Sequence, residues 1–221
     1  MFAQPLNDDQ TQPIRMTVEE YLAFEEQSDT KWEYARGSVY AMTGGTVRHG
    51  VISMNVGTQL NNALEDTDCS VTTPDVKVHI ARRDAFRFPD VVVFCGDAAY
   101  LEGRTDVLTN PILLVEVLSP SSSVTDRNEK LEDYTHIDSL QAYLLVSQHE
   151  AKIERFVRQS DDEWLYTYAL GLDSEIAIPP LHLTLALSKV YRRVTFDVID
   201  VTEENDDNTG ANGETNSYDP A

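Results

Sequence analysis

Apolar residues recur along most of this chain at spacings typical of helices or of strands. Between residues 47 and 64 they follow a helical period, which predicts a long helix. A helix is also predicted over residues 17–27, because its first residues, T-V-E-E, have the pattern of a capping box. Serines at 121–123 are candidate N-caps for a third helix that continues to about His136.

Runs of β-branched and aromatic residues, separated by turn residues, predict a series of strands. Residues 32–42 have this character around Gly37, which predicts a strand or a hairpin bent at that glycine. Residues 90–95 contain three successive valines and residues 111–118 are almost wholly apolar, so both segments are expected to be buried strands. Further strands are predicted at residues 71–73, 76–80, 141–147, 152–158 and 163–170, with a short closing helix over residues 185–191.

The two ends of the chain lack this apolar spacing. Residues 1–16 are polar and contain two prolines, so they are predicted to form a flexible leader. Residues 197–221 are acidic with little to bury, which predicts a disordered tail. One domain is expected over residues 17–196, because a chain of 221 residues can bury one sizeable core.

The sequence shows no export or membrane-insertion signal and contains few cysteines. No basic segment followed by an apolar one opens the chain, and no run approaches the roughly 18 apolar residues of a membrane span, so neither export nor membrane insertion is predicted. The two cysteines, Cys69 and Cys95, are too few for a disulfide scaffold and belong to no Cys-x-x-Cys pair. A reducing cytoplasm is therefore the expected location.

The chain carries 38 acidic and 17 basic residues, and its formal charge of −21 should repel phosphate backbones and anionic membranes. This charge is unevenly spread. Residues 31–130 hold thirteen acids and ten bases, whereas residues 131–221 hold eighteen acids and six bases. An anionic substrate can therefore approach the middle of the chain, above all if a bound divalent cation offsets the carboxylates there.

Glu116 is the least expected residue in the predicted strand over 111–118. Alternate side chains of a strand face opposite sides, and both sides here consist of leucine, isoleucine and valine around the glutamate. A buried carboxylate without a partner is costly. We therefore expect Glu116 to be protonated, paired with a cation such as an arginine, or bound to a metal ion.

Asp90 and Lys130 become candidates because of Glu116. Asp90 follows a proline at the start of the valine-rich strand, a place that aspartate also takes for turn reasons alone. If this strand lies beside that of Glu116, the two carboxylates can converge on one hard divalent cation. Lys130 shares a helix face with Asp126 and Tyr134, and it either forms a solvated pair with Asp126 or reaches the Glu116 strand.

Several stretches together resemble the Uma family of restriction endonucleases, within the PD-(D/E)XK nuclease superfamily. They are P-D-V-V-V from Pro89, E-V-L-S-P-S-S from Glu116, D-R-N-E-K-L-E-D-Y from Asp126, W-E-Y-A-R-G around Glu33 and R-H-G around His49. The resemblance covers roughly residues 17–190. It implies an α/β (α+β) restriction-endonuclease-like fold, with a central mixed β-sheet flanked by helices.

The chain departs from the wider pattern at two places. Leu118 stands where a Glu-x-Lys motif would have its lysine, and the resemblance implies that Lys130, on the following helix, takes that role. The stretch Y-L-L-V-S-Q at residues 143–148 stands where the family more often has a tryptophan and an aspartate. A divergent member of the family would show such differences.

The resemblance implies metal-assisted hydrolysis of DNA phosphodiester bonds with Mg²⁺, or Mn²⁺, as the cofactor. Asp90 and Glu116 would hold the ion, and Lys130 would orient the attacking water or stabilise charge on the phosphoryl oxygens. Glu33 is implied as an additional ligand or a neighbouring carboxylate. His49 is a candidate for phosphate contact or proton transfer, and a structural histidine near the start of a helix fits the sequence equally well.

DNA is the partner that this mechanism requires, and a homodimer would suit cleavage of both strands. The candidates for backbone contacts are basic residues in the near-neutral middle: Arg36, Arg48, Lys77, Arg82, Arg83 and Arg87. A noncatalytic regulatory module that keeps the fold is the main alternative, and it predicts an exposed apolar patch and no cation site. A glycosidase with two catalytic carboxylates is a weaker alternative, because the aromatic residues lie mainly in predicted core strands.

Overall fold

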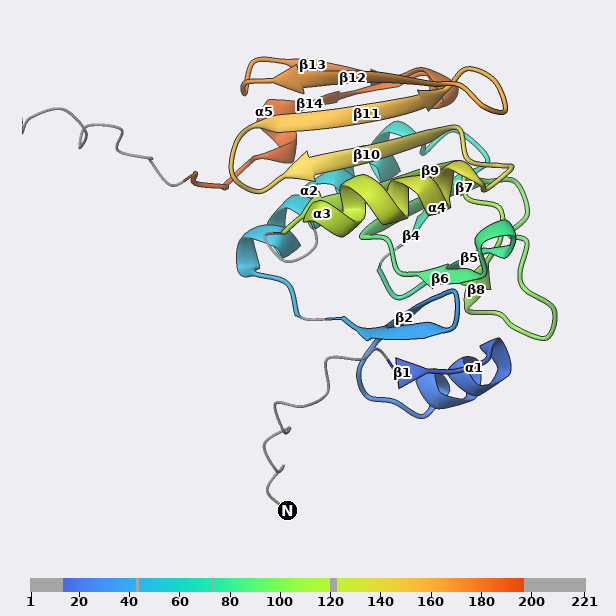
Figure 1. Ribbon diagram of the computed structural model, residues 1–221. Helices are drawn as coiled ribbons and strands as arrows, with labels where there is room; N and C mark the ends of the chain where they lie inside the picture. Colours follow the sequence, from blue (N-terminus) through green and yellow to red (C-terminus); the bar gives the residue numbers. More distant parts are fainter. Residues whose placement is uncertain (1–13, 43, 73, 120–122, 197–221) are drawn as a thin grey trace, which may run out of the picture.

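The valine-rich strand and the strand that carries Glu116 lie side by side. The computed structural model describes residues 14–42, 44–72, 74–119 and 123–196, and Figure 1 shows their arrangement. Strand β7 (Val91–Cys95) pairs antiparallel with β9 (Leu113–Leu118). All six side chains of β9 are buried, as expected for a strand that is covered on both faces.

These two strands belong to a six-stranded sheet, here called the main sheet. Its strand order is β12-β11-β10-β9-β7-β4, and only β9 and β10 pair in parallel. The antiparallel meander predicted after residue 141 is confirmed as β10, β11 and β12. The remaining strands of the main sheet are β4 (Cys69–Thr72), β10 (Ala142–Ser147), β11 (Lys152–Arg158) and β12 (Trp164–Leu170).

A second six-stranded sheet has the order β1-β3-β2-β6-β5-β8, with parallel pairing only between β5 and β8. The hairpin predicted at Gly37 is confirmed: Arg36 and Gly37 have φ values of 51° and 81°, and the glycine adopts its value without steric cost. The strands of this second sheet are β1 (Ile14–Arg15), β2 (Trp32–Ala35), β3 (Ser38–Ala41), β5 (Lys77–Ile80), β6 (Ala85–Arg87) and β8 (Val107–Leu108).

Helices and the second sheet cover the two faces of the main sheet. Helix α2 (Val47–Ala63) packs Ile52, Val56 and Leu60 on one face, together with α5 (Leu187–Val190) and the hairpin of β13 and β14. The other face packs against the second sheet and α4 (Leu131–Thr135). The remaining elements are α1 (Val18–Glu26), α3 (Ser123–Thr125), β13 (Glu175–Ile178), β14 (Leu183–Ala186), a π-helical turn η2 (Asp126–Lys130), and the 3-10 turns η1 (Ala81–Arg83) and η3 (Pro179–Leu181).

The predicted α/β class, with a central mixed sheet and flanking helices, is confirmed, and a second six-stranded sheet and a two-stranded hairpin add to it among the described residues. Helix α1 opens with the predicted capping box: Thr17 N–H donates to Glu20 Oε2 over 2.8 Å, and Glu20 N–H donates back to Thr17 Oγ1. The helix predicted after residue 121 is continuous from Ser123, but its middle turn is π-helical.

Some predicted boundaries differ from the structure. Residues 14–15, assigned to the leader, form β1, because their backbone pairs with β3, a contact that two residues in a mainly polar segment do not signal. The closing helix begins only at Leu187, since the preceding residues pair with β13. The predicted tail, residues 1–13 of the leader and the serine caps at 121 and 122 lie outside the described residues. None of the described helices is long and apolar enough to cross a membrane.

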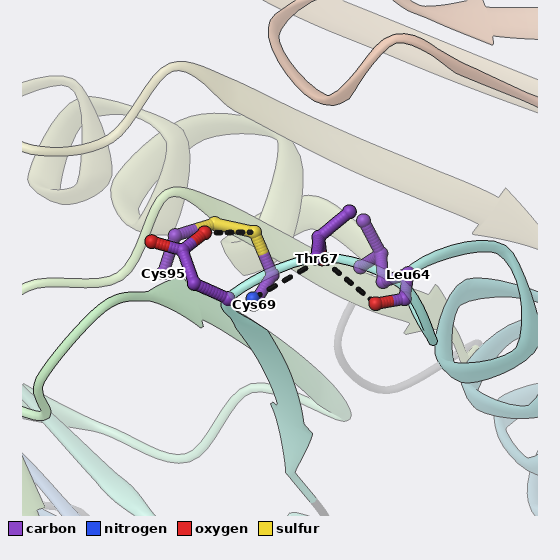
Figure 2. Close-up of a disulfide and its surroundings, with 5 residues drawn as sticks. Leu64, Thr67, Cys69 and Cys95 are labelled. Atoms are coloured by element: carbon purple, nitrogen blue, oxygen red, sulfur yellow. Dashed lines mark hydrogen bonds between the residues drawn. A yellow bond between two sulfur atoms is a disulfide. The ribbon is translucent and has the colours of Figure 1, made fainter.

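A disulfide joins the two cysteines across the edge of the main sheet (Figure 2). Cys69 of β4 lies directly opposite Cys95 of β7, so the antiparallel register brings the two sulfur atoms together. Thr67 fixes the approach to β4, since its hydroxyl donates to Leu64 O and accepts from Cys69 N–H (Figure 2). The expected cytoplasmic location implies reduced cysteines, and the disulfide differs from that expectation. The bond depends on the register of β4 and β7, which the sequence does not reveal.

Opening this disulfide is expected to lower the free energy of unfolding by roughly 3 kcal/mol, because the bond restricts a 26-residue loop of the unfolded chain. Urea denaturation with and without dithiothreitol measures the effect. The double variant Cys69→Ser, Cys95→Ser is the control, and its midpoint should not respond to the reductant. Equal midpoints for the native chain under both conditions would contradict a stabilising role for the bond.

Candidate active site

Asp90 and Glu116 come together because of the register of β7 and β9. Val91 lies opposite Val115, so the preceding Asp90 lies opposite Glu116 at the same end of the pair. The Asp90 carboxylate is held there by Val117 N–H, which donates to Asp90 Oδ2 over 2.7 Å. The condition stated for a shared cation site, that the two strands be neighbours, is therefore met.

Lys130 lies at the centre of three carboxylates that come from three separate elements. Its Nζ is 3.0 Å from Glu116 Oε1 on β9, 3.1 Å from Glu33 Oε1 on β2 and 3.2 Å from Asp126 Oδ1 on η2. The Lys130 side chain is only 7% exposed. Since water is nearly excluded, these charges act on one another more strongly than on a surface.

The π-helical turn aims one row of side chains at β9. Asp126, Lys130 and Tyr134 all lie on the buried side of this helical segment, and Tyr134 donates its hydroxyl to Glu116 Oε1 over 2.7 Å. Of the two alternatives for Lys130, the contact with the Glu116 strand is present, and its pair with Asp126 is buried, because these two residues are 5% and 1% exposed. Glu116 has a lysine and a tyrosine as partners, and not an arginine.

Burial and neighbouring charges act in opposite directions on the pKa values of this cluster. Burial raises the pKa of Glu116 well above its ordinary value, and the carboxylates of Asp126, Asp90 and Glu33 add to the rise against the effect of Lys130. Burial would lower the pKa of Lys130, but its three carboxylate neighbours outweigh burial and raise that pKa. Lys130 is therefore charged, and a further cation near Glu116 would favour its ionised form.

Burial likewise opposes ionisation of Glu33, but Lys130 and Arg87 outweigh it and lower the pKa of Glu33. Three donors fix this carboxylate. Arg87 Nη1 donates to Oε2 over 3.0 Å, Phe88 N–H donates to Oε1 over 3.2 Å, and Lys130 Nζ lies 3.1 Å from Oε1. These contacts favour the ionised form of Glu33, and the carboxylate orients Lys130.

His49 sits in the first turn of α2, beside Asp90. Thr46 caps the helix by accepting from His49 N–H, and His49 Nε2 lies 3.1 Å from Asp90 Oδ2. The hydrogen bond to Asp90 raises the pKa of His49, against the opposing effect of burial. Gln148 ties this turn to the main sheet, since its amide accepts from Thr46 Oγ1 and donates to Leu118 O.

Asp133 holds three guanidinium groups beside the cluster. Arg36 and Arg83 reach its Oδ1 over 2.8 and 3.2 Å, and Arg87 Nη2 reaches its Oδ2 over 2.6 Å. Burial raises the pKa of Asp133, but the bonds from Arg87, Arg36 and Arg83 outweigh burial and lower it. Because Arg87 also binds Glu33, the second sheet, α4 and the cluster around Lys130 share one network of charges.

The proposed DNA-contacting cations are largely committed to carboxylates of the protein. Lys77 and Arg87 are 3% and 1% exposed, so their assignment to the DNA backbone is wrong. Arg36, Arg82 and Arg83 remain accessible in part but pair with acidic residues. Arg48 donates to Gln148 O over 3.4 Å.

A cavity of about 930 Å³ opens onto the cluster, and all five residues singled out from the sequence line it. These residues are Glu33, His49, Asp90, Glu116 and Lys130. Their selection from the sequence depended on Glu116 and on motif resemblance. Asp126 also lines the cavity, and its carboxylate was not selected, although its four-residue spacing from Lys130 was the available signal.

The donor set suits a small divalent cation. Asp90, Glu116 and Asp126 offer carboxylate oxygens, which Mg²⁺ and Mn²⁺ prefer. Asp126 Oδ1 is a buried oxygen that accepts no hydrogen bond of good geometry from any described residue. A carboxylate oxygen in that state would gain from a metal ion. The residues present therefore fit Mg²⁺ or Mn²⁺.

A family model, two relatives and a solved structure match most of this chain. The model of the family Uma2, described as "Putative restriction endonuclease", matches residues 18–188. The uncharacterized proteins slr1290 and sll1609 of Synechocystis are 36% and 31% identical over 182 and 161 residues, which are 82% and 73% of this chain and 94% and 91% of theirs. A crystal structure titled as a "putative nuclease belonging to DUF820" from Anabaena variabilis matches with a TM-score of 0.66 and 18% identity, over 80% of this chain and 97% of that one.

Replacing Asp133 with asparagine is expected to destabilise the fold by about 3–5 kcal/mol at pH 7, because Arg87 then keeps a buried charge with one fewer counter-charge. The lowered pKa of Asp133 contributes stability above its unfolded value of about 3.9, and this is lost as the pH falls through the folded value. Urea denaturation from pH 7 to pH 3 should therefore show a smaller acid loss for Asp133→Asn than for the native chain.

The matched control is Glu132→Gln, which removes an exposed carboxylate from the neighbouring residue. It should change the free energy of unfolding by less than about 1 kcal/mol. Equal stabilities of the two variants at pH 7 would exclude Asp133 as the centre of the charge network.

Proposed function

The chain belongs to the Uma2 family, and from this membership and the cluster around Lys130 we propose that it is a Mg²⁺- or Mn²⁺-dependent endodeoxyribonuclease. The observation that carries the proposal is the convergence of Asp90, Glu116 and Lys130. Asp90 directly precedes β7, Glu116 lies in β9 and Lys130 lies in η2, and all three line one open cavity. Metal-assisted hydrolysis of a phosphodiester uses such a meeting of metal-binding oxygens and a fixed cation.

Asp90 and Glu116 would hold the divalent ion, with Asp126 as the third carboxylate. An ion bound there would polarise the scissile phosphate and lower the pKa of a coordinated water. The two main ligands differ in exposure. The Asp90 side chain is 13% exposed at the cavity, whereas the Glu116 side chain is 5% exposed and lies deeper. The substrate would therefore approach from the side of Asp90.

Lys130 would stabilise the negative charge that develops on the phosphoryl oxygens. Its ammonium is already fixed by Glu33, Glu116 and Asp126, so little reorganisation is needed when charge develops. Glu33 acts as a positioning residue for Lys130. His49, which borders the cavity beside Asp90, would contact a phosphate oxygen or pass a proton to the leaving oxygen.

The acidic surroundings also favour a role for the metal ion in substrate binding. Five of the six basic residues considered for DNA contacts are buried or paired with acids, so these side chains offer limited attraction to a phosphate backbone. A divalent ion bound by the carboxylates would supply the missing positive charge at the place of reaction. DNA affinity is then expected to depend on the divalent cation.

Binding of Mg²⁺ or Mn²⁺ is expected to weaken at least about tenfold in Glu116→Gln, because the variant loses a charged oxygen ligand but keeps the shape of the side chain. Isothermal titration calorimetry measures the affinity, and circular dichroism checks the fold. Glu132→Gln should bind as the native chain does. Unchanged affinity in a folded Glu116→Gln variant would remove Glu116 from the metal site.

Cleavage of supercoiled plasmid and single-stranded DNA is expected with Mg²⁺ or Mn²⁺ and should stop on addition of a chelator. Glu116→Gln and Lys130→Met should each lose at least about 100-fold in rate, because each removes a charge that acts on the reacting phosphate. Glu132→Gln should cleave at the native rate.

The outcome separates the two main functions. Cleavage that survives in both variants would exclude this site. No cleavage together with no metal binding by the folded native protein would favour a noncatalytic module that retains the nuclease fold.

A further inference from the structure

The strand β12 forms one edge of the main sheet and exposes large apolar side chains. Tyr166, Tyr168 and Leu170 are 47%, 58% and 54% exposed, and they lie on one face together with Trp164. An edge strand of this length normally carries a charge or a proline that prevents pairing with another chain. The seven residues of β12 contain neither.

Its aromatic face is already ordered in a single chain. Tyr166 packs on Phe156 with ring centres 5.1 Å apart, and its hydroxyl donates to Glu154 Oε2 over 3.2 Å. Lys152 lies over the ring of Tyr168, 5.5 Å from its centre. Side chains that are fixed before association lose little conformational entropy when a partner binds.

The direction of the backbone groups of β12 follows from the two ends of its pairing with β11. Gly171 N–H donates to Ala151 O at one end, and Glu163 O accepts from Gln159 N–H at the other. Antiparallel strands alternate between positions that exchange hydrogen bonds and positions that do not. The odd-numbered residues of β12 therefore bond to β11, and its even-numbered residues direct their N–H and C=O groups away from the sheet.

These outward groups form an open edge. Among the described residues, one bond to them is made, from Ser174 Oγ to Leu170 O. The N–H and C=O groups of Tyr166 and Tyr168 make none with any other described residue. They are thus available to a further antiparallel strand.

The sequence of β12, W-L-Y-T-Y-A-L, is complementary to itself in the antiparallel direction. A two-fold axis at Thr167 places Tyr166 opposite Tyr168 of a second copy, and Trp164 opposite Leu170. All four are even-numbered residues with outward backbone groups, so each of these pairs can exchange two hydrogen bonds. The two aromatic faces then form one surface, since cross-strand aromatic pairs are favourable.

Charge also selects this edge for contact between copies. The whole chain carries −21, so two copies repel each other over most of their surface. Strands β11 and β12 together carry three cations and one acid, Lys152, Arg155, Arg158 and Glu154. These two strands therefore lack the excess of acids that the whole chain carries.

We propose that a second copy of this chain pairs with β12, antiparallel and centred on Thr167, to form a two-fold symmetric homodimer with one continuous sheet. This interface uses the same surface on both copies, so association stops at two. The proposal does not depend on nuclease activity, because it uses only the edge strand. It is tested without metal ion or DNA.

Sedimentation equilibrium should give twice the chain mass of 24.8 kDa, and Tyr168→Lys should give the monomer mass. The substitution places an ammonium group opposite Tyr166 of the other copy and leaves the bonds to β11 intact. The control Tyr100→Lys changes another exposed tyrosine, at 49% against 58% for Tyr168, that lies outside β12, and this variant should remain dimeric. A native chain that stays monomeric up to about 100 µM, a concentration that detects dissociation constants well into the micromolar range, would overturn the proposal.

Cross-linking tests the register of the two β12 strands with cysteine substitutions that leave the fold intact. Thr167→Cys puts two thiols at the axis, where opposing Cβ atoms of a pair without hydrogen bonds are about 5 Å apart. Mild oxidation should convert it to a covalent dimer, whereas Leu165→Cys, which faces Ala169 of the other copy, should not cross-link. Dimers that persist in Tyr168→Lys, or an equal yield from both cysteine variants, would show that the copies meet elsewhere.

Discussion

The ammonium group of Lys130, held between Glu33, Glu116 and Asp126, is the contact on which the rest of the molecule depends. It joins the second sheet, the main sheet and the helix that crosses them. From Glu33 the alternation of charge continues through Arg87 to Asp133. Acidic and basic groups thus follow one another from β9 to α4, and each buried charge has an opposite neighbour.

The residues of this network contribute both to the free energy of unfolding and to the proposed site. Removing any one member leaves a buried opposite charge with one fewer counter-charge, which costs more than the loss of a surface ion pair. A purely apolar interface between the two sheets would be cheaper to fold, but it would offer no oxygen ligands and no fixed cation at the cavity. The proposed site lies where the two sheets meet, and its oxygen ligands and fixed cation would require charged groups at this place.

The sequence predicts the individual strands well and their association less well. Glu116 stands out because alternation places a carboxylate among apolar residues, and the burial of its strand follows from that pattern. The meeting of Asp90 with Glu116 depends on strand register, which acts between segments far apart in the chain. Asp126 was visible as a neighbour of Lys130, but its burial depends on the helical segment packing on the main sheet, where Tyr143 donates to Asp126 O, and spacing cannot show this. Short strands such as β1 and β8 exist only through pairing.

The disulfide between Cys69 and Cys95 turns part of the chain into a closed covalent ring. Within this ring lie β5 and β6 of the second sheet as well as Asp90 and Arg87, whereas Glu116 and Lys130 lie outside it. The covalent ring therefore passes through both sheets and leaves and re-enters the main sheet at neighbouring strands. If a protease cut one peptide bond inside the ring, the two fragments would remain a single molecule, and Asp90 would keep its tether to the end of α2.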